Sequence, residues 1–241
     1  LCIVIGFASC EKDNPDENVT DNSSTTQTSN ENIKDEIKVL SLNKEYISHY
    51  EWYEDTSTML VRSEYSDVTL DKSMEKQYPL LAKTLAETSA MRKRAMEDEK
   101  DNYISFATEE LKKDSENFST YVSTLDVQVR RADSIAVSIL EDYYADGSRK
   151  FNGINYDTES GKELGLADVF TGTSKIPTVV EKEIMSRIGE DEPAGDTAVI
   201  EYFKNTPDDS ITWTLDYDGV TFYFNPGDIA PTNFGVQVVT V

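Results

Sequence analysis

The stretch 211–235, ITWTLDYDGVTFYFNPGDIAPTNFG, constrains the fold most, because its pattern is that of a β-hairpin. The pair Asp218-Gly219 suits a two-residue type I′ turn, since both central residues of that turn need a positive φ. Counting outward from this turn predicts that Trp213 faces Phe224, with apolar residues on one face and polar or amphipathic residues on the other. A slip of one residue would turn every side chain to the opposite face, so the pattern predicts the register as well.

Length and charge narrow the class of protein. At 241 residues the chain can form one large domain or two small ones around a genuine core. Its 46 acidic and 23 basic residues give a formal net charge of −23. A nucleic-acid partner is not expected, because phosphate binding needs clustered lysine and arginine. The charge suits a basic partner, although a solvated acidic exterior explains it equally well.

His49 is the single histidine of the chain. Zinc sites built from several histidines and cysteines are therefore excluded. Catalysis by a Ser-His-Asp or Cys-His arrangement would depend on this one residue. Its aromatic neighbours Tyr46, Tyr50 and Trp52 favour a partly packed or exposed histidine instead.

Residues 1–10, LCIVIGFASC, form a short apolar run that ends in the small residues Ala8 and Ser9 before Cys10. This arrangement resembles the end of a bacterial lipoprotein signal, in which the cysteine is lipidated. The run is too short to span a bilayer. We therefore expect Cys10 to carry lipid and to be the membrane attachment of the protein.

Residues 11–36 are polar and carry eight acidic residues against two lysines. Such a stretch has almost nothing to bury, so we expect a disordered acidic tether. The acids directly after the cysteine, in EKDNPDE, resemble the surface-export signal of lipoproteins in the Bacteroidetes. With Cys10 lipidated and Cys2 in the cleaved segment, no thiol remains for a disulfide or a metal. The predicted location is the cell envelope, periplasmic or surface-exposed.

Hydrophobic periodicity places the elements of the folded part, which begins near residue 37. Pro79 interrupts the helical pattern, and the block RKRAMEDEKD (92–101) has opposite charges three and four residues apart, which predicts an exposed helix face. The expected strands are 38–47, 58–70, 121–129, 135–144 and 151–156. The expected helices are 72–116, as one long or broken helix, 177–188, with Gly189 as its end signal, and 198–203. The sequence therefore predicts an α+β fold, with one or more antiparallel sheets and packed helices in two small subdomains, 37–118 and 119–241.

Three stretches, 129–144, 155–170 and 222–231, resemble a domain of unknown function found at the C-terminus of the anti-sigma factor RsiV, beside the deacetylase PdaC and in many bacterial lipoproteins. The resemblance covers about 120–241, and 37–118 resembles the small domain that usually precedes it. The residues that match the family pattern are Asp157, Gly161, Lys162, Leu166, Asp168, Phe170, Phe224, Pro226, Ile229, Ala230 and Pro231.

The chain departs from the family pattern in two places. The segment 146–150, DGSRK, stands where family members carry a Gly-Gly-Ala-His element, so the role of that histidine cannot be carried over. The aromatic residue that follows the second proline in the family is replaced near Thr232-Asn233. The deacetylase domain, the transmembrane helix and the sigma-binding segment of these relatives are not expected either.

No G-x-S-x-G, phosphate loop, H-E-x-x-H or dinucleotide fingerprint occurs, so we expect no catalytic residues, no metal and no cofactor. Tyr143, Tyr144, Arg149 and Lys150 combine aromatic rings with hydrogen-bond donors near a turn, which is typical of ligand contacts. An ordinary strand end with an exposed turn is the competing interpretation.

The function that we expect from the sequence is binding by a lipid-anchored envelope protein. The resemblance to RsiV implies a cell-wall polymer, or an extracellular protein such as lysozyme, as the partner. The alternative is a glycan hydrolase that uses a carboxylate pair, since the many acidic residues offer many such pairs.

Overall fold

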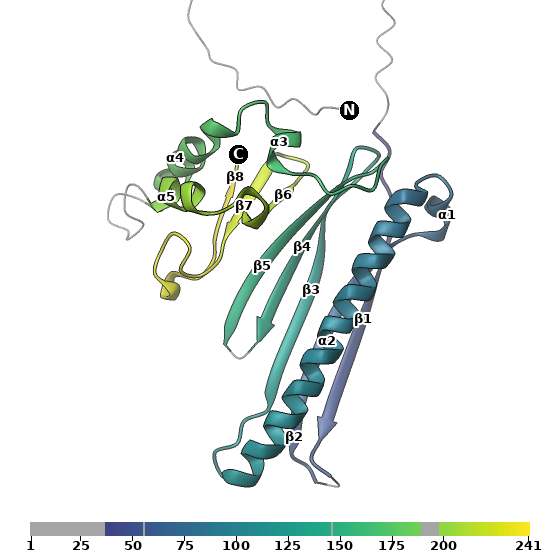
Figure 1. Ribbon diagram of the computed structural model, residues 1–241, viewed down its shortest axis with the longest axis vertical. Helices are drawn as coiled ribbons and strands as arrows, with labels where there is room; N and C mark the ends of the chain where they lie inside the picture. Colours follow the sequence, from purple (N-terminus) through teal and green to yellow (C-terminus); the bar gives the residue numbers. More distant parts are fainter. Residues whose placement is uncertain (1–36, 55, 146, 189–197) are drawn as a thin grey trace, which may run out of the picture.

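The computed structural model describes residues 37–54, 56–145, 147–188 and 198–241. Its largest feature is a five-stranded sheet in the order β1-β2-β3-β4-β5, along which a long helix lies (Figure 1). The strands of this sheet are β1 (Leu42–Trp52), β2 (Met59–Leu70), β3 (Tyr121–Ala132), β4 (Ala136–Ala145) and β5 (Ser148–Asp157).

Neighbouring strands of the sheet are antiparallel except for β2 and β3, which pair in parallel from Val61 opposite Tyr121 to Tyr65 opposite Leu125. The chain between them passes through α1 (Lys72–Glu75) and α2 (Pro79–Lys113), and such a crossover returns it to the end of the sheet from which β2 started. The α+β class is confirmed, with this parallel pair as the difference from the predicted antiparallel pairing. One sheet thus includes strands from both predicted ranges, 37–118 and 119–241.

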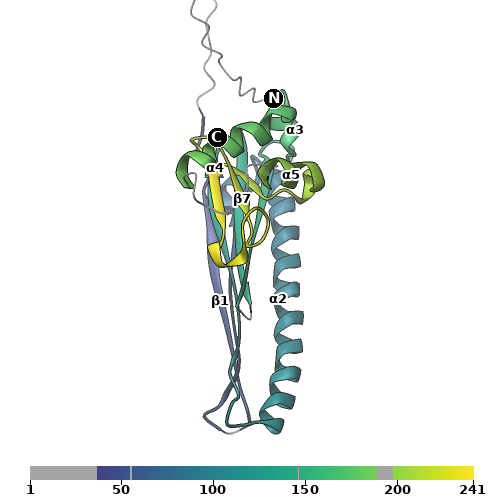
Figure 2. The same ribbon diagram turned by 90° about the vertical axis from the view of Figure 1, so that its left-hand side faces the viewer.

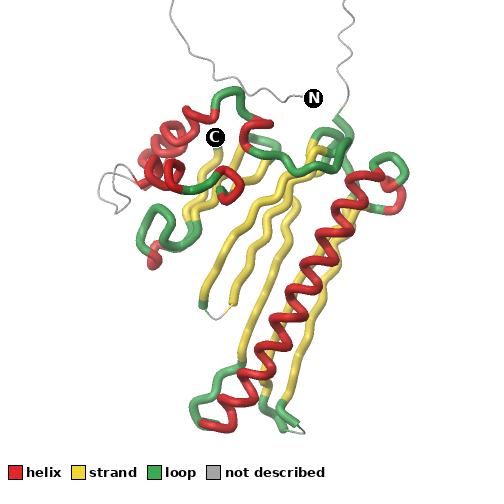
Figure 3. Tube along the Cα trace, in the orientation of Figure 1, coloured by secondary structure: helices red, strands yellow, loops and turns green. Residues whose placement is uncertain are grey.

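The predicted interruption of the long helix is confirmed. Asp71 caps α1 by accepting a hydrogen bond from the Ser73 backbone N–H at 2.9 Å. Pro79 occupies the first turn of α2, where its missing N–H costs nothing. The 35 residues of α2 then run along the sheet, chiefly over β2 (Figure 3). They bury Leu81 and Leu85 against it.

The charged block 92–101 was predicted to form an exposed helix face, but part of it is buried. Arg92 is only 6 % exposed, and Met96, one turn later, is buried as well. Both residues lie on the face of α2 that continues the buried positions 81 and 85, so the helix presents them to the sheet. Arg92 and Met96 are therefore buried because of their position on the helix, although the block as a whole is polar.

A second, three-stranded antiparallel sheet has the order β6-β7-β8. Its strands are β6 (Trp213–Leu215), β7 (Val220–Phe224) and β8 (Gln237–Thr240). The predicted hairpin is present, but its register differs by two residues, because Trp213 pairs with Phe222 rather than with Phe224. The Asp216 N–H donates to the Gly219 carbonyl at 2.8 Å, so the turn centres on residues 217–218. A shift of two leaves every side chain on its predicted face.

The small sheet packs on the face of β4 and β5 that is opposite to α2 (Figure 2). The two sheets approach closely at Gly153 of β5, because this residue has no side chain. A Cβ atom at this position would lie 2.0 Å from the Trp213 carbonyl oxygen. Beside it, the Asn155 side chain accepts a hydrogen bond from the Leu215 N–H at 2.8 Å and donates to the Trp213 carbonyl at 3.0 Å. The polar face of the hairpin, including Thr214, is consequently buried too.

Three short helices cover the outer face of the small sheet, namely α3 (Leu166–Val169), α4 (Ile176–Ile188) and α5 (Ala198–Asn205). The 3-10 turns η1 (Thr173–Lys175), η2 (Asp208–Ser210) and η3 (Thr232–Phe234) lie in the connecting segments. Apolar side chains of α3, α4 and α5 form one core with the strands, in which Phe203 meets Phe222 edge to face with ring centroids 5.5 Å apart. The helices predicted from 177 and 198 are confirmed, and the predicted stop at Gly189 lies outside the described residues.

The predicted signal (1–10), the tether (11–36) and the lipidation residue Cys10 also lie outside the described residues. Within the described ranges, none of the helices has both the length and the apolar character needed to cross a membrane.

Candidate functional site

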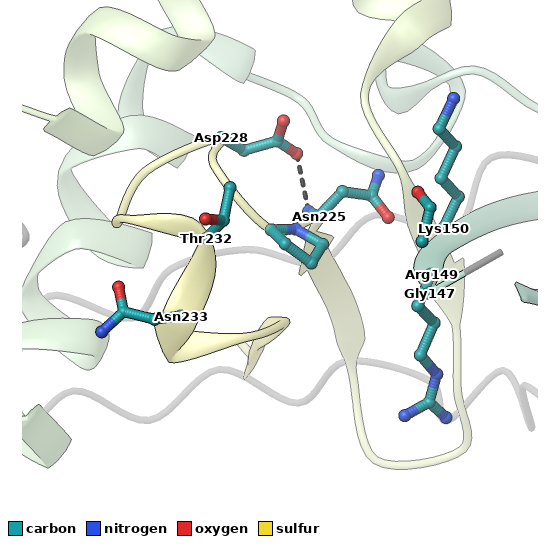
Figure 4. Close-up of a pocket in the computed structure, with 9 residues that line it drawn as sticks. Gly147, Arg149, Lys150, Asn225, Asp228, Thr232 and Asn233 are labelled. Carbon is teal, nitrogen blue, oxygen red and sulfur yellow. Dashed lines mark hydrogen bonds between the residues drawn. The ribbon is translucent and has the colours of Figure 1, made fainter. Parts of the chain in front are cut away.

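A pocket of about 710 Å³ lies at the end of the β4–β5 hairpin, between the start of β5 and the loop that follows β7 (Figure 4). Its lining residues are Gly147, Ser148, Arg149, Lys150, Asn225, Pro226, Asp228, Thr232 and Asn233. Segments from the two sheets thus meet here.

The loop after β7 is held on β5 by Asn225. Its side-chain oxygen accepts a hydrogen bond from the Phe151 backbone N–H at 2.6 Å. Asp228 in turn accepts a hydrogen bond from the Asn225 N–H at 2.7 Å, the bond drawn in Figure 4. Gly227, with φ of +96°, supplies the left-handed residue that this tight turn requires.

Arg149 is fixed at the edge of the pocket. Its guanidinium donates two hydrogen bonds to Asp142, at 2.8 and 2.5 Å, and these bonds raise the pKa of Arg149. The same group lies 4.9 Å over the Phe151 ring, which stacks on Tyr223 at 5.8 Å. Lys150 is exposed and makes no ion pair with another described residue.

Asp228 is the carboxylate among the lining residues, and its partial burial raises its pKa, against the opposing effect of the Asn225 N–H. A second pocket of about 570 Å³ shares Asp228 and Thr232 and adds Tyr202 and Glu201. Burial first, and then the charge of Asp228, raise the pKa of Tyr202 to about 12. The first pocket therefore has the Arg149 guanidinium at its edge and Asp228 as its carboxylate, in a protein that is strongly acidic overall.

The structure brings the four predicted ligand residues to one end of the hairpin. Tyr143 pairs with Lys150 across β4 and β5, and the adjacent pair is Tyr144 with Arg149. Because neighbouring residues of a strand point to opposite faces, the two pairs are separated by the sheet. Figure 4 shows the side chains of Arg149 and Lys150 pointing in opposite directions from β5.

On the α2 side of the same hairpin lies a groove of about 510 Å³, lined by Tyr143 and Lys150 from the predicted set. The remaining lining residues are Arg92, Ala95, Met96, Glu99, Leu125, Glu141, Phe151 and Asn152. Tyr143 donates a hydrogen bond to Glu99. No local pattern connects α2 with β4, because only the fold brings these residues together.

Residues of the loop after β7 were missed as ligand candidates, namely Asn225, Asp228, Thr232 and Asn233. The available signal was indirect. Both departures from the family pattern, the segment 146–150 and the pair at 232–233, supply lining residues of the first pocket.

Most residues that match the family pattern stabilise the fold. Asp157 accepts a hydrogen bond from the Ser160 N–H at 2.7 Å and closes the turn to Gly161. Gly161 has φ of +64°, and a Cβ there would lie 2.7 Å from the Leu80 backbone. Asp168 accepts a hydrogen bond from the Gly165 N–H at 2.8 Å and so caps α3. These three matching residues therefore stabilise turns and a helix end, whereas the matching residue Pro226 lies in the pocket beside the segments that differ.

In residues 37–54, 56–145, 147–188 and 198–241, no group of three or more His, Cys, Asp or Glu side chains could hold a metal ion. His49 is partly exposed, with its ring 6.4 Å from that of Tyr65. It lies on β1, the edge strand farthest from β5 in the sheet order.

Residues 167–241 match the family described as "Protein of unknown function (DUF3298)". The fold is similar to the crystal structure of a DUF3298 family member from Bacteroides fragilis, at a TM-score of 0.56 and 18 % identity, covering 85 % of this chain and 91 % of that one. A DUF3298 family protein from Pseudomonas aeruginosa gives a TM-score of 0.46 and 14 % identity, covering 84 % and 90 %. None of the curated proteins matches the chain.

The predicted domain of unknown function is thereby confirmed, with the family match spanning residues 167–241. The similarity to the Bacteroides fragilis structure extends to the fold, including the part before that domain. Neither comparison states a function, so the links to RsiV and PdaC stay predictions.

Proposed function

We propose that this protein is a non-catalytic binding protein of the bacterial cell envelope, and that the pocket beside Arg149 holds part of a cell-wall glycan polymer. The supporting observation is the lining of this pocket, where cationic, amide and hydroxyl groups from two sheets surround a space of about 710 Å³. Wall polymers carry carboxylates, amides and hydroxyls, and these groups pair with such donors.

Arg149 suits a ligand carboxylate. Arginine binds carboxylates through parallel N–H donors, and Asp142 engages only Nε and Nη2 of Arg149. The Arg149 side chain is 54 % exposed, so its remaining N–H groups are open to solvent. Lys150 follows Arg149 in β5, and its side chain leaves the strand in the opposite direction as a second, flexible cation at the same end of the hairpin. Because the rest of the protein repels anions, binding would depend on these short-range contacts.

Co-sedimentation of the full chain with purified cell-wall sacculi tests the proposal. Replacing both cations, in Arg149→Ala/Lys150→Ala, should weaken binding about tenfold or more, as the loss of charge-assisted hydrogen bonds does. The matched control is Lys112→Ala/Lys113→Ala, an adjacent exposed pair at the end of α2 with the same change in charge. Equal losses in the two double variants, or no sedimentation of the wild type, would overturn the proposal.

The formal charge of −23 favours a second candidate partner, a cationic extracellular protein such as lysozyme. Electrostatic attraction raises mainly the rate of association, and salt screens it over roughly 10 Å at 0.1 M. Lysozyme association should therefore slow steeply with added salt. Loss of Arg149 and Lys150 should leave this binding unchanged or strengthen it, which separates it from glycan binding.

A glycan hydrolase remains the alternative to binding, and Asp228 with its raised pKa is the residue that favours it. Hydrolysis requires two carboxylates about 5–10 Å apart, and Glu201 lines the adjoining pocket. Release of reducing ends from wall glycan, abolished in Asp228→Asn, would establish this activity in place of simple binding.

The envelope location is proposed together with the lipid anchor at Cys10. The supporting observation is the apolar run that ends in Ala8-Ser9-Cys10, followed by a polar stretch. Cys10→Ser should move the protein from the membrane fraction to the soluble fraction. An unchanged distribution between the two fractions would contradict the lipid anchor but would not bear on the proposal for the pocket.

A further inference from the structure

The five-stranded sheet has two edges, and the fold covers one of them. The outer edge of β5 is occupied by segments that follow it in the chain. The Phe151 N–H donates to the Asn225 side chain at 2.6 Å, and the Phe151 carbonyl accepts a hydrogen bond from the Thr212 hydroxyl at 3.2 Å. Farther along β5, the Asn155 carbonyl accepts a hydrogen bond from the Leu164 N–H at 2.7 Å. These backbone groups are thus satisfied within the molecule.

The opposite edge is β1, and none of the described segments pairs with its outer side. Figure 1 shows β1 as the outermost strand of the sheet. Its 11 residues pair with β2 regularly, from Leu42 opposite Leu70 to Glu51 opposite Val61. Because an edge strand is paired on one side only, about half of its backbone N–H and C=O groups point away from β2.

The features that usually protect an edge strand are scarce in β1. The strand contains no proline, and its one register shift lies at its end, next to Trp52. Its single lysine, Lys44, is held by Asp126 at 2.6 Å across the face of the sheet. Tyr46 and Tyr50 are 73 % and 48 % exposed. A long and regular edge with exposed aromatic rings is typical of a strand that pairs with another chain.

One register joins β1 to a second copy of itself over its full length. In a symmetric antiparallel pair of identical strands, the centre of the paired stretch lies on a twofold axis. The centre of Leu42–Trp52 is Ile47, so Ile47 faces Ile47 of the second copy in this register. Pairing all 11 residues forms about ten backbone hydrogen bonds. The same edge is used on both copies, so assembly stops at the dimer.

The side chains that face each other in this register are compatible. On the α2 side, Glu45 faces His49 of the second copy, once on each side of the axis, and a carboxylate accepts a hydrogen bond from an imidazole N–H. On the opposite side, Lys44 faces the ring of Tyr50 of the second copy. A shift of two residues would instead set Glu45 against Glu51, which like charges disfavour.

The rest of the fold leaves room for this pairing. α2 lies chiefly over β2, and the two copies of β2 would be three strand spacings apart, roughly 14 Å. Packed helices need about 8–10 Å between their axes, so both copies of α2 fit on the same face of the joined sheet. The small sheet packs on β4 and β5, at the far end of the strand order (Figure 2).

We infer that β1 is an interaction surface and that its partner is a second copy of this chain, paired antiparallel with Ile47 on the twofold axis. The contact uses one strand edge from each copy and is smaller than the interface of a permanent dimer, so the association is weak and depends on concentration. The dimer has two pockets beside Arg149, and a polymer that reaches both is held at two points. The pairing itself does not depend on binding in those pockets.

Sedimentation equilibrium of the full chain, at concentrations from about 1 to 200 μM, tests the association. The protein carries Cys2→Ser/Cys10→Ser, which removes both native thiols. A monomer–dimer equilibrium is expected. A monomer at every concentration would mean that solvent or another segment covers the edge, and would overturn the inference.

An exchange of charges tests the facing side chains. His49→Glu sets like charges opposite each other twice and should raise the dissociation constant about fivefold. Glu45→Lys/His49→Glu restores opposite charges across the axis and should recover the original value. Positions 45 and 49 of one copy lie roughly 13 Å apart, so this recovery has no source within a single copy.

The matched control is Glu159→Lys/His49→Glu, which has the same net charge but places the lysine at an exposed turn after β5. This control should stay as weak as His49→Glu. Equal recovery in the two double variants would show that net charge alone governs the association, and would contradict the proposed pairing.

Cysteine cross-linking tests the register in the same thiol-free background. Ile47→Cys sets two thiols opposite each other at a Cα separation of about 4.5–5.5 Å, which suits a disulfide, so oxidation should give a covalent dimer. Ser48→Cys is the control, because this position is more exposed than Ile47 but faces Tyr46 of the second copy. It should link at least about fivefold more slowly. Faster linkage through position 48 than through position 47 would rule out this register.

Discussion

The two faces of the five-stranded sheet are stabilised by different means. On the α2 side, an aliphatic core that includes Leu81 and Leu85 is combined with a buried arginine that lies between two carboxylates. On the opposite side, the small sheet and its helices form a core of aliphatic and aromatic side chains with edge-to-face ring contacts. Buried ion pairs thus contribute to the first core, and contacts between aromatic rings contribute to the second.

This difference explains where the cavities lie. Apolar packing is non-directional and closes gaps, whereas buried ion pairs hold side chains apart at fixed distances. The groove lined by Arg92 and Glu99 accordingly lies on the α2 side. The apolar side opens at its edge, in the pocket beside Arg149 and in the adjoining pocket lined by Tyr202.

The largest expected effect comes from emptying the apolar side. Phe222 is fully buried, and Phe222→Ala should lower the free energy of unfolding by about 3–5 kcal/mol, as deletions of large aromatic residues do. Urea denaturation measures the change. Val238→Ala on the neighbouring strand, where the side chain is 42 % exposed, is the control and should cost less than about 1 kcal/mol. Similar losses in both variants would contradict the burial described for this side.

Breaking the charge pairs on the α2 side should cost somewhat less. Arg92→Met leaves Asp67 and Glu141 buried without their cation, and we expect a loss of about 3 kcal/mol. The triple variant Arg92→Met/Asp67→Asn/Glu141→Gln removes the uncompensated charges and should recover a large part of this loss. A triple variant as unstable as the single one would show that packing, not charge, dominates on this side.

The contact between the two sides depends on Asn155, and its loss should have an intermediate effect. Asn155→Ala leaves the buried Leu215 N–H without its Asn155 acceptor, so we expect a cost of about 1–3 kcal/mol. Ser138 also accepts from this N–H, at 3.1 Å, which places the expected value toward the lower end. A cost below the error of urea denaturation would mean that the serine alone satisfies this group.

The smallest effect is expected in the pH dependence of the apolar side. Burial raises the pKa of Tyr202 to about 12, above the ordinary value of 10.0, so the native state favours the neutral phenol. Its contribution to stability is complete below pH 10 and is lost as the pH rises toward 12. Tyr202→Phe should therefore lose less stability than the wild type over this interval. Parallel pH profiles for the two proteins would contradict the burial of the phenol.

Local patterns predicted the elements of the fold because each pattern reports the burial of its own residues. The alternation around residues 213 and 224 predicted the correct buried face, because a register shift of two residues leaves each side chain on the same face. The exact partners were wrong, because the Asp218-Gly219 pair suited a turn that the chain makes one residue earlier, at 217–218. The residue pair at the turn therefore predicted the register less well than the apolar pattern predicted the buried face.

Contacts between distant segments could not be predicted in the same way. Nothing near Arg92 in the sequence indicates that Asp67 and Glu141 lie opposite it, so its charge suggested exposure. The hairpin end with Arg149 and Lys150 was singled out from its local composition as a candidate contact region, and both residues line the first pocket. Its partner loop at 225–233 was not, because the two meet only through the packing of one sheet on the other.

The parallel pair of β2 with β3 also has a consequence for how fast the protein reaches its native state. The β1–β2 hairpin and the β3–β4–β5 meander join sequence neighbours, whereas Val61 and Tyr121 meet only after the whole of α1 and α2 has been placed. Closing so long a connection costs chain entropy before any pairing rewards it, so this joint should form late and limit the folding rate. Until it closes, β2 and β3 are both open edges, to which a strand from another copy could add.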